Sequence, residues 1–233
     1  MNGNVANLRN RQVKGNGKVK FLDKIYIIDI DEKMIDSLMK YFQWETNVEL
    51  CCCDIESFLK DHIEKIDGVT SAANSFGIMD GGLDKALVDF FGEQLQSNVQ
   101  RVIQKEFLGE QPVGTCLTID IPGYNKKILH TPTMRIPQPI LDPRIIYTAT
   151  RSTLVEAIKN QIFTITLPAF GHLTGNVRSE IVAQYMRMAY DDVKKTLQET
   201  SSINTWEFVY ENKNIDGVLF KSYFSGNSPH NKQ

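Results

Sequence analysis

The sequence DGVTSAANSFGIMDGGLDKALVDFFG, residues 67–92, combines a strand, a loop and a helix in direct succession. Residues 68–73 are small and partly β-branched, which is typical of a buried strand. The loop that follows cannot continue the strand, because it contains Gly77, Gly81 and Gly82. From residue 83 onward apolar side chains recur at helical spacing. The glycines therefore open a helix at the end of a strand.

The glycine-rich loop is also the first candidate binding site. Glycine amides can adopt positive φ and approach a ligand closely, as phosphate-binding loops require. The N-terminus of the following helix adds free amides and a partial positive charge, which favour an anion such as a pyrophosphate. A helix-opening turn without a ligand has the same pattern, so the loop alone leaves both interpretations open.

A second strand, loop and helix follow near the end of the chain. The strand FTITL, residues 163–167, runs into a loop with Gly171 and Gly175. A helix with a clear apolar face then extends from Val177 to Leu197. Two such loops at the carboxyl ends of neighbouring strands would form a crevice, which is the usual ligand position in open α/β sheets.

The other elements complete an α/β pattern. Further strands are expected at residues 21–30, 48–53, 115–121 and 127–131. Helices are expected after a cap at Asp31, over residues 56–63, in one stretch over residues 83–106, and from residue 146. Residues 130–137 contain two prolines and are expected to be irregular.

Length and charge limit the domain organisation and the class of partner. The chain has 233 residues, enough for one well-buried core, and its net charge of -2 indicates no nucleic-acid partner. Residues 1–20 contain five basic residues and no acid, so they are predicted as a flexible basic arm with at most a weak nucleic-acid role. Residues 21–224 are predicted as a single domain and residues 225–233 as a flexible tail.

The cysteines and the hydropathy pattern bear on metal binding and location. Cys51, Cys52 and Cys53 are adjacent and Cys116 is isolated, which is neither a disulfide framework nor a zinc-ligand spacing. Consecutive strand residues point to opposite faces, so the three thiols cannot converge on one metal, and none is expected. Without a membrane-spanning run or a secretion signal, a cytoplasmic protein in a reducing compartment is expected. Delivery into a host cell stays open.

The first loop resembles that of macro domains, the ADP-ribose-binding modules. In that family the strand ends Ala-Ala-Asn, runs into consecutive glycines and is followed by an acid ten residues beyond the asparagine. Asn74, Gly81, Gly82 and Asp84 match this pattern. The resemblance implies that Asn74 contacts the distal ribose and that Asp84 helps to activate a water in hydrolytic members. Asp80 is the second catalytic candidate, standing where the family commonly has glycine.

The second loop is similar to the family's phosphate loop, in which Pro-Ala precedes a Gly-x-x-x-Gly turn. The resemblance implies that this loop wraps the diphosphate with Gly171, His172, Leu173, Thr174, Gly175 and Asn176. His172 stands where the family usually has Thr, Ser or Cys, and Asn176 stands near a position that is commonly aromatic. Ser71 likewise occupies a strand position that is often Asn. Gly175→Val is expected to fill the diphosphate path.

Two further segments resemble the adenine site of the family. Asp54 and Ile55 close the preceding strand, and the acid would accept a hydrogen bond from the adenine amino group. Asp54 could equally be the N-cap of the following helix. In a strand predicted at residues 206–210, Phe208 or Tyr210 would stack on adenine, although core packing explains such rings as well.

The resemblance implies a three-layer α/β/α fold with a mixed central sheet, in a divergent branch known from bacterial, phage and effector proteins. The implied ligand is ADP-ribose, with no cofactor or metal, and the implied partner is an ADP-ribosylated protein. Hydrolysis of the ADP-ribosyl bond is the first hypothesis, and a reader that binds without cleaving is the second. The third is a structural protein whose pocket is filled by Phe76, Met79 or Phe170.

A rival interpretation concerns the first predicted strand. Asp29 and Asp31 lie between a strand and a helix, as the ribose-binding acid of nucleotide-binding methyltransferases does. That interpretation needs a glycine-rich turn between a strand and a helix upstream. Gly15 and Gly17 have no strand before them, so the sequence favours the macro domain interpretation.

Overall fold

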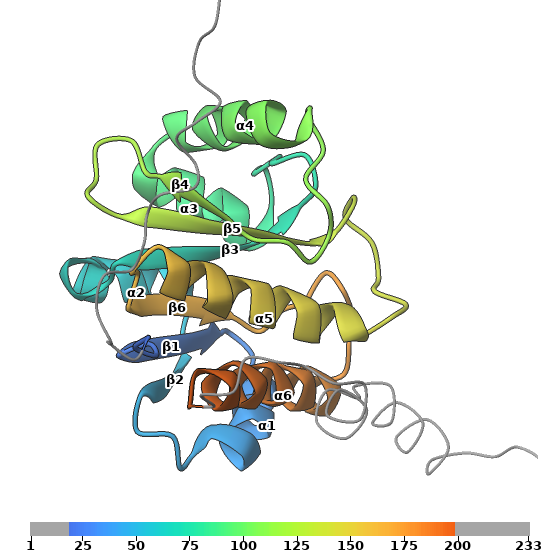
Figure 1. Ribbon diagram of the computed structural model, residues 1–233. Coiled ribbons are helices and arrows are strands. Elements are labelled where there is room, and N and C mark those ends of the chain that lie inside the picture. Colours follow the sequence, from blue (N-terminus) through green and yellow to red (C-terminus); the bar gives the residue numbers. More distant parts are fainter. Residues whose placement is uncertain (1–18, 199–233) are drawn as a thin grey trace, which may run out of the picture.

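The computed structural model describes residues 19–198, which form a six-stranded sheet in the order β2-β1-β6-β3-β5-β4 (Figure 1). The strands are β1 (Lys24–Asp29), β2 (Val48–Cys52), β3 (Gly68–Asn74), β4 (Leu117–Asp120), β5 (Lys127–Met134) and β6 (Thr164–Pro168). The helices are α1 (Glu32–Phe42), α2 (Ile55–His62), α3 (Gly82–Phe91), α4 (Gln94–Phe107), α5 (Arg144–Lys159) and α6 (Ser179–Gln198), with a 3-10 turn η1 (Ile63–Lys65). The strand predicted at residues 206–210, including Phe208, lies outside the described residues.

The sheet is mixed and is covered on both faces. Strands β1, β2, β3, β5 and β6 pair in parallel, and β4 pairs antiparallel with β5 at one edge. One hydrophobic core packs α1, α5 and α6 against one face, and a second packs α2, α3 and α4 against the other. This is the three-layer α/β/α fold that the sequence predicts. No helix within the described residues is both long and apolar enough to cross a membrane.

Aspartates cap two of the helices that follow strands. The Asp31 carboxylate accepts a hydrogen bond from the Lys33 amide at 2.9 Å, which confirms the predicted cap of α1. The Asp54 carboxylate accepts one from the Ser57 amide at 2.8 Å and caps α2 in the same way. Both caps lie at the carboxyl ends of strands, so the chain turns into each helix at the same edge of the sheet.

The long helix predicted over residues 83–106 is wrong, because the chain forms two helices there. Gly92 follows the last residue of α3 with a φ of 99°, and its amide bonds back to the Val88 carbonyl. That positive φ ends a helix and turns the chain into α4. Apolar spacing resumes after the break, which is why periodicity alone joins the two helices.

The expectation that residues 130–137 are irregular is also wrong in its first half, because β5 continues through Pro132 to Met134. Pro132 pairs with Ala73 of β3, while its carbonyl accepts a hydrogen bond from the Gly114 amide at 2.8 Å on the opposite side. The nitrogen of a strand residue faces the same side as its carbonyl. The missing N–H therefore removes no bond to β3, and proline is tolerated there.

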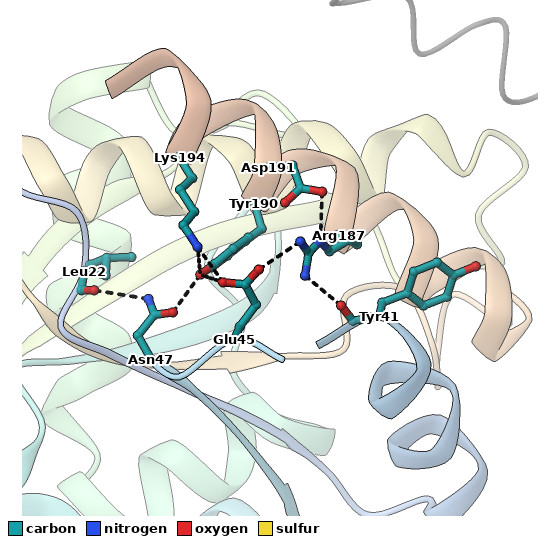
Figure 2. Close-up of polar contacts among 8 residues, drawn as sticks. All are labelled: Leu22, Tyr41, Glu45, Asn47, Arg187, Tyr190, Asp191 and Lys194. Atoms are coloured by element: carbon teal, nitrogen blue, oxygen red, sulfur yellow. Dashed lines mark hydrogen bonds and ion pairs between the residues drawn. The ribbon is translucent and has the colours of Figure 1, made fainter. Parts of the chain in front are cut away.

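A polar cluster fixes α6 to the loop between α1 and β2 (Figure 2). Glu45 receives hydrogen bonds from Lys194 at 2.5 Å and from the Tyr190 hydroxyl at 2.8 Å, and Arg187 lies 2.9 Å from its other oxygen. Asn47 adds a contact to the same hydroxyl at 2.7 Å. Glu45 therefore links three positions on one face of α6 to a loop far away in sequence.

Candidate functional site

The two glycine-bearing loops lie side by side, because they follow neighbouring parallel strands. Strands β3 and β6 pair at Gly68 and Ile165, and the loops leave from their carboxyl ends. Both loops line one cavity of about 460 Å³. The sequence-predicted residues that line it are Asp54, Ile55, Asn74, Asp80, Gly81, Gly82, Asp84, Gly171, His172, Leu173, Thr174 and Gly175. Asn176 does not line it, and Phe208 lies outside the described residues.

The first loop, residues 75–81, is shaped by Asn74. The side-chain oxygen of Asn74 accepts hydrogen bonds from the amides of Phe76 and Ile78 at 3.1 and 3.3 Å, and its side-chain nitrogen donates to the Ile78 carbonyl at 2.6 Å. The Met79 amide donates to the Gln96 side chain of α4 at 2.6 Å. Asn74 thus holds the turn that brings Gly81 and Gly82 to the cavity.

Asp84 and Asp80 differ sharply in their surroundings. Asp84 is only 6% exposed, and it accepts a hydrogen bond from the Ser71 hydroxyl of β3 at 2.6 Å. Burial raises the pKa of Asp84 to about 6, and the Ser71 hydroxyl opposes that rise. Asp80 lies exposed at the mouth of the same cavity. The cavity is therefore lined by one buried carboxyl, that of Asp84, and by one exposed carboxyl, that of Asp80.

The second loop, residues 169–177, is closed by its own backbone. The amides of His172, Asn176 and Val177 donate to the carbonyls of Ala169, Leu173 and Gly171 at 3.1, 2.9 and 3.0 Å. A Cβ at Gly175 would lie 2.6 Å from the Gly171 carbonyl oxygen, inside the loop. The expectation that Gly175→Val would fill the diphosphate path is thus replaced by a packing conflict within the loop.

Several cavity-lining amides of the two loops have no hydrogen-bond acceptor. Within residues 19–198, those of Gly81, Gly82, Gly171, Leu173, Thr174 and Gly175 are among them. The amides of His172 and Asn176 are already engaged inside the loop. Free amides from two loops on one cavity form a site for an oxygen-rich anion.

A third wall of the cavity comes from the end of β1, with Ile28, Asp29 and Ile30. The His172 imidazole contacts the Asp31 carboxylate at 3.0 Å and lowers the pKa of Asp31. Asp29 lines the cavity, and burial raises its pKa, while the Asp31 amide and His172 oppose that rise. Sequence reasoning considered Asp29 and Asp31 as ligand-binding residues only under the methyltransferase interpretation. Their position at the carboxyl end of β1, which pairs with β6, was the available signal.

Asp54 is the N-cap that its sequence position allowed, and its role as an adenine acceptor stays a prediction. Its Oδ1 caps α2, and the residue also lines the cavity at the end of β2. Ile55, next to it, is buried and reaches the same cavity. A carboxylate has acceptor sites on two oxygens, so a cap on one leaves the other for a ligand donor.

The family assignment rests on a match that spans both loops. A family model of the Macro domain matches residues 70–186, half of the chain. The chain belongs to the macro domain family. The matched region runs from β3 to the middle of α6 and so includes both glycine-bearing loops. The narrower branch of bacterial, phage and effector proteins stays a prediction.

Individual relatives of this macro domain are distant. An uncharacterized protein of Aquifex aeolicus is 27% identical over 131 residues, which cover 55% of this chain and 76% of that protein. The macrodomain of Mycobacterium tuberculosis DarG has a TM-score of 0.48 at 16% identity, covering 55% of this chain and 83% of that one. The Oceanobacillus iheyensis macrodomain with MES bound has a TM-score of 0.49 at 17% identity, covering 67% and 86%.

A larger protein, Thermosipho africanus DarTG in complex with ADP-ribose, is similar over part of its length. Its TM-score is 0.45 at 17% identity, and the likeness covers 68% of this chain and 48% of that one. Structural likeness of this degree carries no argument about a ligand or about single residues. The site of this macro domain is therefore argued from its own geometry.

The side chains of Phe76, Met79 and Phe170, which the third hypothesis placed in the pocket, do not fill the cavity of this macro domain. Met79 and Phe170 are buried in opposite cores, and the Phe76 ring lies against the Arg135 guanidinium at 5.0 Å. None of these three residues lines the cavity. The apolar residues at its mouth are instead Ile30, Ile78 and Leu173, which are 61%, 44% and 59% exposed.

The wall of the cavity is acidic. Its ionisable residues are Asp29, Asp54, Asp80, Asp84, Cys53 and His172, and no lysine or arginine lines it among the described residues. The same part of the chain contains no group of three His, Cys, Asp or Glu residues arranged to hold a metal ion. An anion in this cavity would therefore have to be held by backbone amides rather than by a cation.

Proposed function

We propose that the cavity binds ADP-ribose, free or attached to a protein. The observation that carries the proposal is that two neighbouring loops line a cavity of about 460 Å³ with residues whose amides have no acceptor within residues 19–198. Pockets of this volume hold small-molecule ligands. A diphosphate is the group that such amides suit best, and the family resemblance supplies the nucleotide to which it belongs.

In this proposal the diphosphate, the adenine and the distal ribose contact different walls of the cavity. The amides of Gly81 and Gly82 and those of Gly171, Thr174 and Gly175 hold the diphosphate between them. The second carboxylate oxygen of Asp54 accepts the adenine amino group, because the first oxygen caps α2. The distal ribose then lies near the first loop, where Asn74 and Asp80 reach the cavity.

Hydrolysis of the ADP-ribosyl bond is the further step that we propose. The glycosidic bond breaks with oxocarbenium character, so a carboxylate near the anomeric carbon can stabilise the charge or activate a water. Asp84 has a pKa near neutrality, which suits proton transfer, and Asp80 has a carboxylate at the open side of the cavity. Separate Asp80→Asn and Asp84→Asn variants would assign these roles.

A reader without turnover is the second candidate function, and the Ser71–Asp84 contact favours it. Asp84 is almost completely buried, and one of its oxygens is occupied by the Ser71 hydroxyl at 2.6 Å. An acid in the first turn of a helix is also favourable for electrostatic reasons that need no catalysis. In a reader, Asp84 would fix α3 on β3 and nothing more.

Calorimetric titration with ADP-ribose, ADP and NAD tests binding. A dissociation constant of about a micromolar for ADP-ribose is expected. Gly82→Asn should weaken it at least tenfold, because Gly82 lines the cavity and the space around its Cβ position is open. Gly123→Asn is the matched control: it also has positive φ and open space, but it lies away from the cavity. Absence of heat with all three ligands would refute the proposal.

Release of ADP-ribose from a mono-ADP-ribosylated protein, followed by gel, separates the two candidates. A hydrolase releases the label, and Asp80→Asn or Asp84→Asn slows the release without removing calorimetric binding. A reader binds ADP-ribose and releases nothing at any pH between about 5 and 8, the range in which a carboxyl with a raised pKa changes its charge.

A further inference from the structure

A buried histidine that the proposed function does not use lies under the first loop. His130 on β5 is fully buried, and its Nδ1 lies 2.6 Å from the side-chain oxygen of Gln111. Its Nε2 is buried and has no hydrogen-bond partner among the described residues. Gln111, which precedes β4, is fully buried as well. An imidazole nitrogen without a partner at such depth is costly unless something uses it.

Gln111 fixes the tautomer of His130. The side-chain nitrogen of Gln111 donates to the carbonyls of Thr115 and His130 at 3.3 and 3.2 Å, so its side-chain oxygen is the atom that faces the imidazole. That oxygen can only accept, so the proton of the neutral imidazole lies on Nδ1. The Nε2 of His130 is therefore an unprotonated acceptor.

The strand register places His130 beside Ser71. His130 pairs with Ser71 in the parallel ladder of β5 and β3, and paired residues project from the same face of a sheet. Neighbouring strands are about 4.8 Å apart. Ser71 is fully buried, and its hydroxyl donates to Asp84 at 2.6 Å. Asp84, Ser71, His130 and Gln111 thus form one buried polar layer beneath the cavity.

We propose that His130 is a positioning residue for Asp84. When the Asp84 carboxyl carries a proton, the Nε2 of His130 accepts a hydrogen bond from the Ser71 hydroxyl. In the ionised state, Ser71 donates to the Asp84 carboxylate. When the carboxylate takes a proton from solvent, the new O–H donates to the Ser71 oxygen and the Ser71 hydroxyl turns to His130. No other bond breaks, and the orphan acceptor gains a partner.

The titration ranges of the two groups agree with this arrangement. Burial lowers the pKa of His130 to about 3 and raises that of Asp84 to about 6, so the imidazole is neutral while Asp84 titrates. Asp29, Asp54 and Asp80 share the cavity with Asp84, from β1, α2 and the first loop. Lys85, next in sequence, pairs with Asp89 at the surface. Burial and Ser71 are the causes of the Asp84 shift.

The test is a ¹³C NMR titration of the Asp84 carboxyl in aspartate-labelled protein. His130→Phe should lower the pKa of Asp84 by about one unit, the size of one hydrogen bond, because the protonated state loses its final acceptor. Greater apolar burial alone would raise that pKa, so a fall is diagnostic. In a Ser71→Ala background the same substitution should change nothing further, since Ser71 transmits the effect.

His62→Phe is the matched control. His62 lies on α2 and stacks on Phe58 with ring centroids 4.4 Å apart, away from the cavity wall. It should leave the pKa of Asp84 unchanged. An unchanged or raised pKa in His130→Phe, or an equal fall in His62→Phe, would overturn the proposal.

A second measurement uses the unaltered protein, so it tests the proposal even if His130→Phe fails to fold. With ¹⁵N-labelled histidine, the Nε2 resonance of His130 should move with the midpoint of the Asp84 titration as it gains a hydrogen bond. A resonance that stays fixed through that titration contradicts the proposal. The first measurement reads the Asp84 carboxyl and the second reads His130 while Asp84 titrates. Neither needs a ligand, so both hold whether or not the cavity binds ADP-ribose, and failure of the calorimetric test leaves them intact.

Discussion

Replacing Gly175 by serine should destabilise the second loop from within. A Cβ at this position would lie 2.6 Å from the Gly171 carbonyl oxygen, 2.9 Å from the Gly171 Cα and 2.7 Å from Ile140 Cδ1. Two of these atoms are backbone and cannot rotate away. The Gly175 carbonyl also accepts the Ile140 amide at 2.8 Å, so a shift of Gly175 disturbs the segment before α5.

The expected cost follows from that crowding. Overpacking a close-packed site costs about 1–3 kcal/mol, and contact with fixed backbone favours the upper end. For a domain of this size, about 3 kcal/mol lowers the melting temperature by roughly 6–12 °C. Thermal unfolding followed by circular dichroism measures this directly. Binding of ADP-ribose should weaken in parallel, because the Gly171 and Gly175 amides move together.

Gly81→Ser is the matched control in the first loop. No atom lies within 4 Å of a Cβ placed on Gly81, and its φ of -150° suits any residue. Serine is also a favoured N-cap, and Gly81 is the N-cap of α3. This variant should therefore be as stable as the parent or slightly more stable. If Gly175→Ser melts with the parent protein, or if both variants lose stability equally, the packing argument for the second loop is refuted.

Three further predictions concern other parts of the structure. Burial raises the pKa of Asp84 from 3.8 to about 6, so the folded state binds this proton more tightly than the unfolded state does. The free energy of unfolding should therefore fall by roughly 3 kcal/mol as pH rises from about 4 to about 6. In urea titrations, Asp84→Asn should abolish that pH-dependent fall and be more stable than the parent above pH 6. Glu45→Ala should cost about 2 kcal/mol in the same assay, because three donors on α6 lose their acceptor, although Lys194 is partly exposed. Asp31→Ala removes the cap of α1 and the partner of His172, so a lower unfolding midpoint in urea is expected; an unchanged midpoint would contradict the capping role.

Much of the fold could be predicted because the local signals agree with the tertiary structure. Strand, glycine loop and helix follow one another at residues 67–92 and again after residue 163, and the Asp31 cap fixed the start of α1. The break at Gly92 was missed because helical spacing resumes after it. The strand through Pro132 was missed because tolerance of proline depends on which neighbour its nitrogen faces, and that depends on where β4 begins.

The candidate site likewise has features that the sequence predicts and features that it does not. Motif spacing was enough to select Asp54, Asn74 and the glycines as cavity-lining residues, since each stands at the end of a strand or in the segment that follows it. The role of Gly175 could not be predicted, because it depends on how closely the loop folds back on Gly171. The Ser71–Asp84 contact depends on how α3 lies over β3. Long-range register of this kind has no signature in the local sequence.

Burial lessens the conflict between the acidic wall of the cavity and the anion binding that we propose. Four aspartates line the cavity, and no lysine or arginine does so within residues 19–198. Charged carboxylates would repel a diphosphate strongly in so enclosed a space. Burial, however, raises the pKa of both Asp29 and Asp84, so each ionises at a higher pH than a solvated carboxyl does, whereas Asp54 and Asp80 are exposed. The desolvation that raises the pKa of Asp84 to about 6 would therefore also reduce, at mildly acidic pH, the repulsion between the cavity wall and the proposed anion.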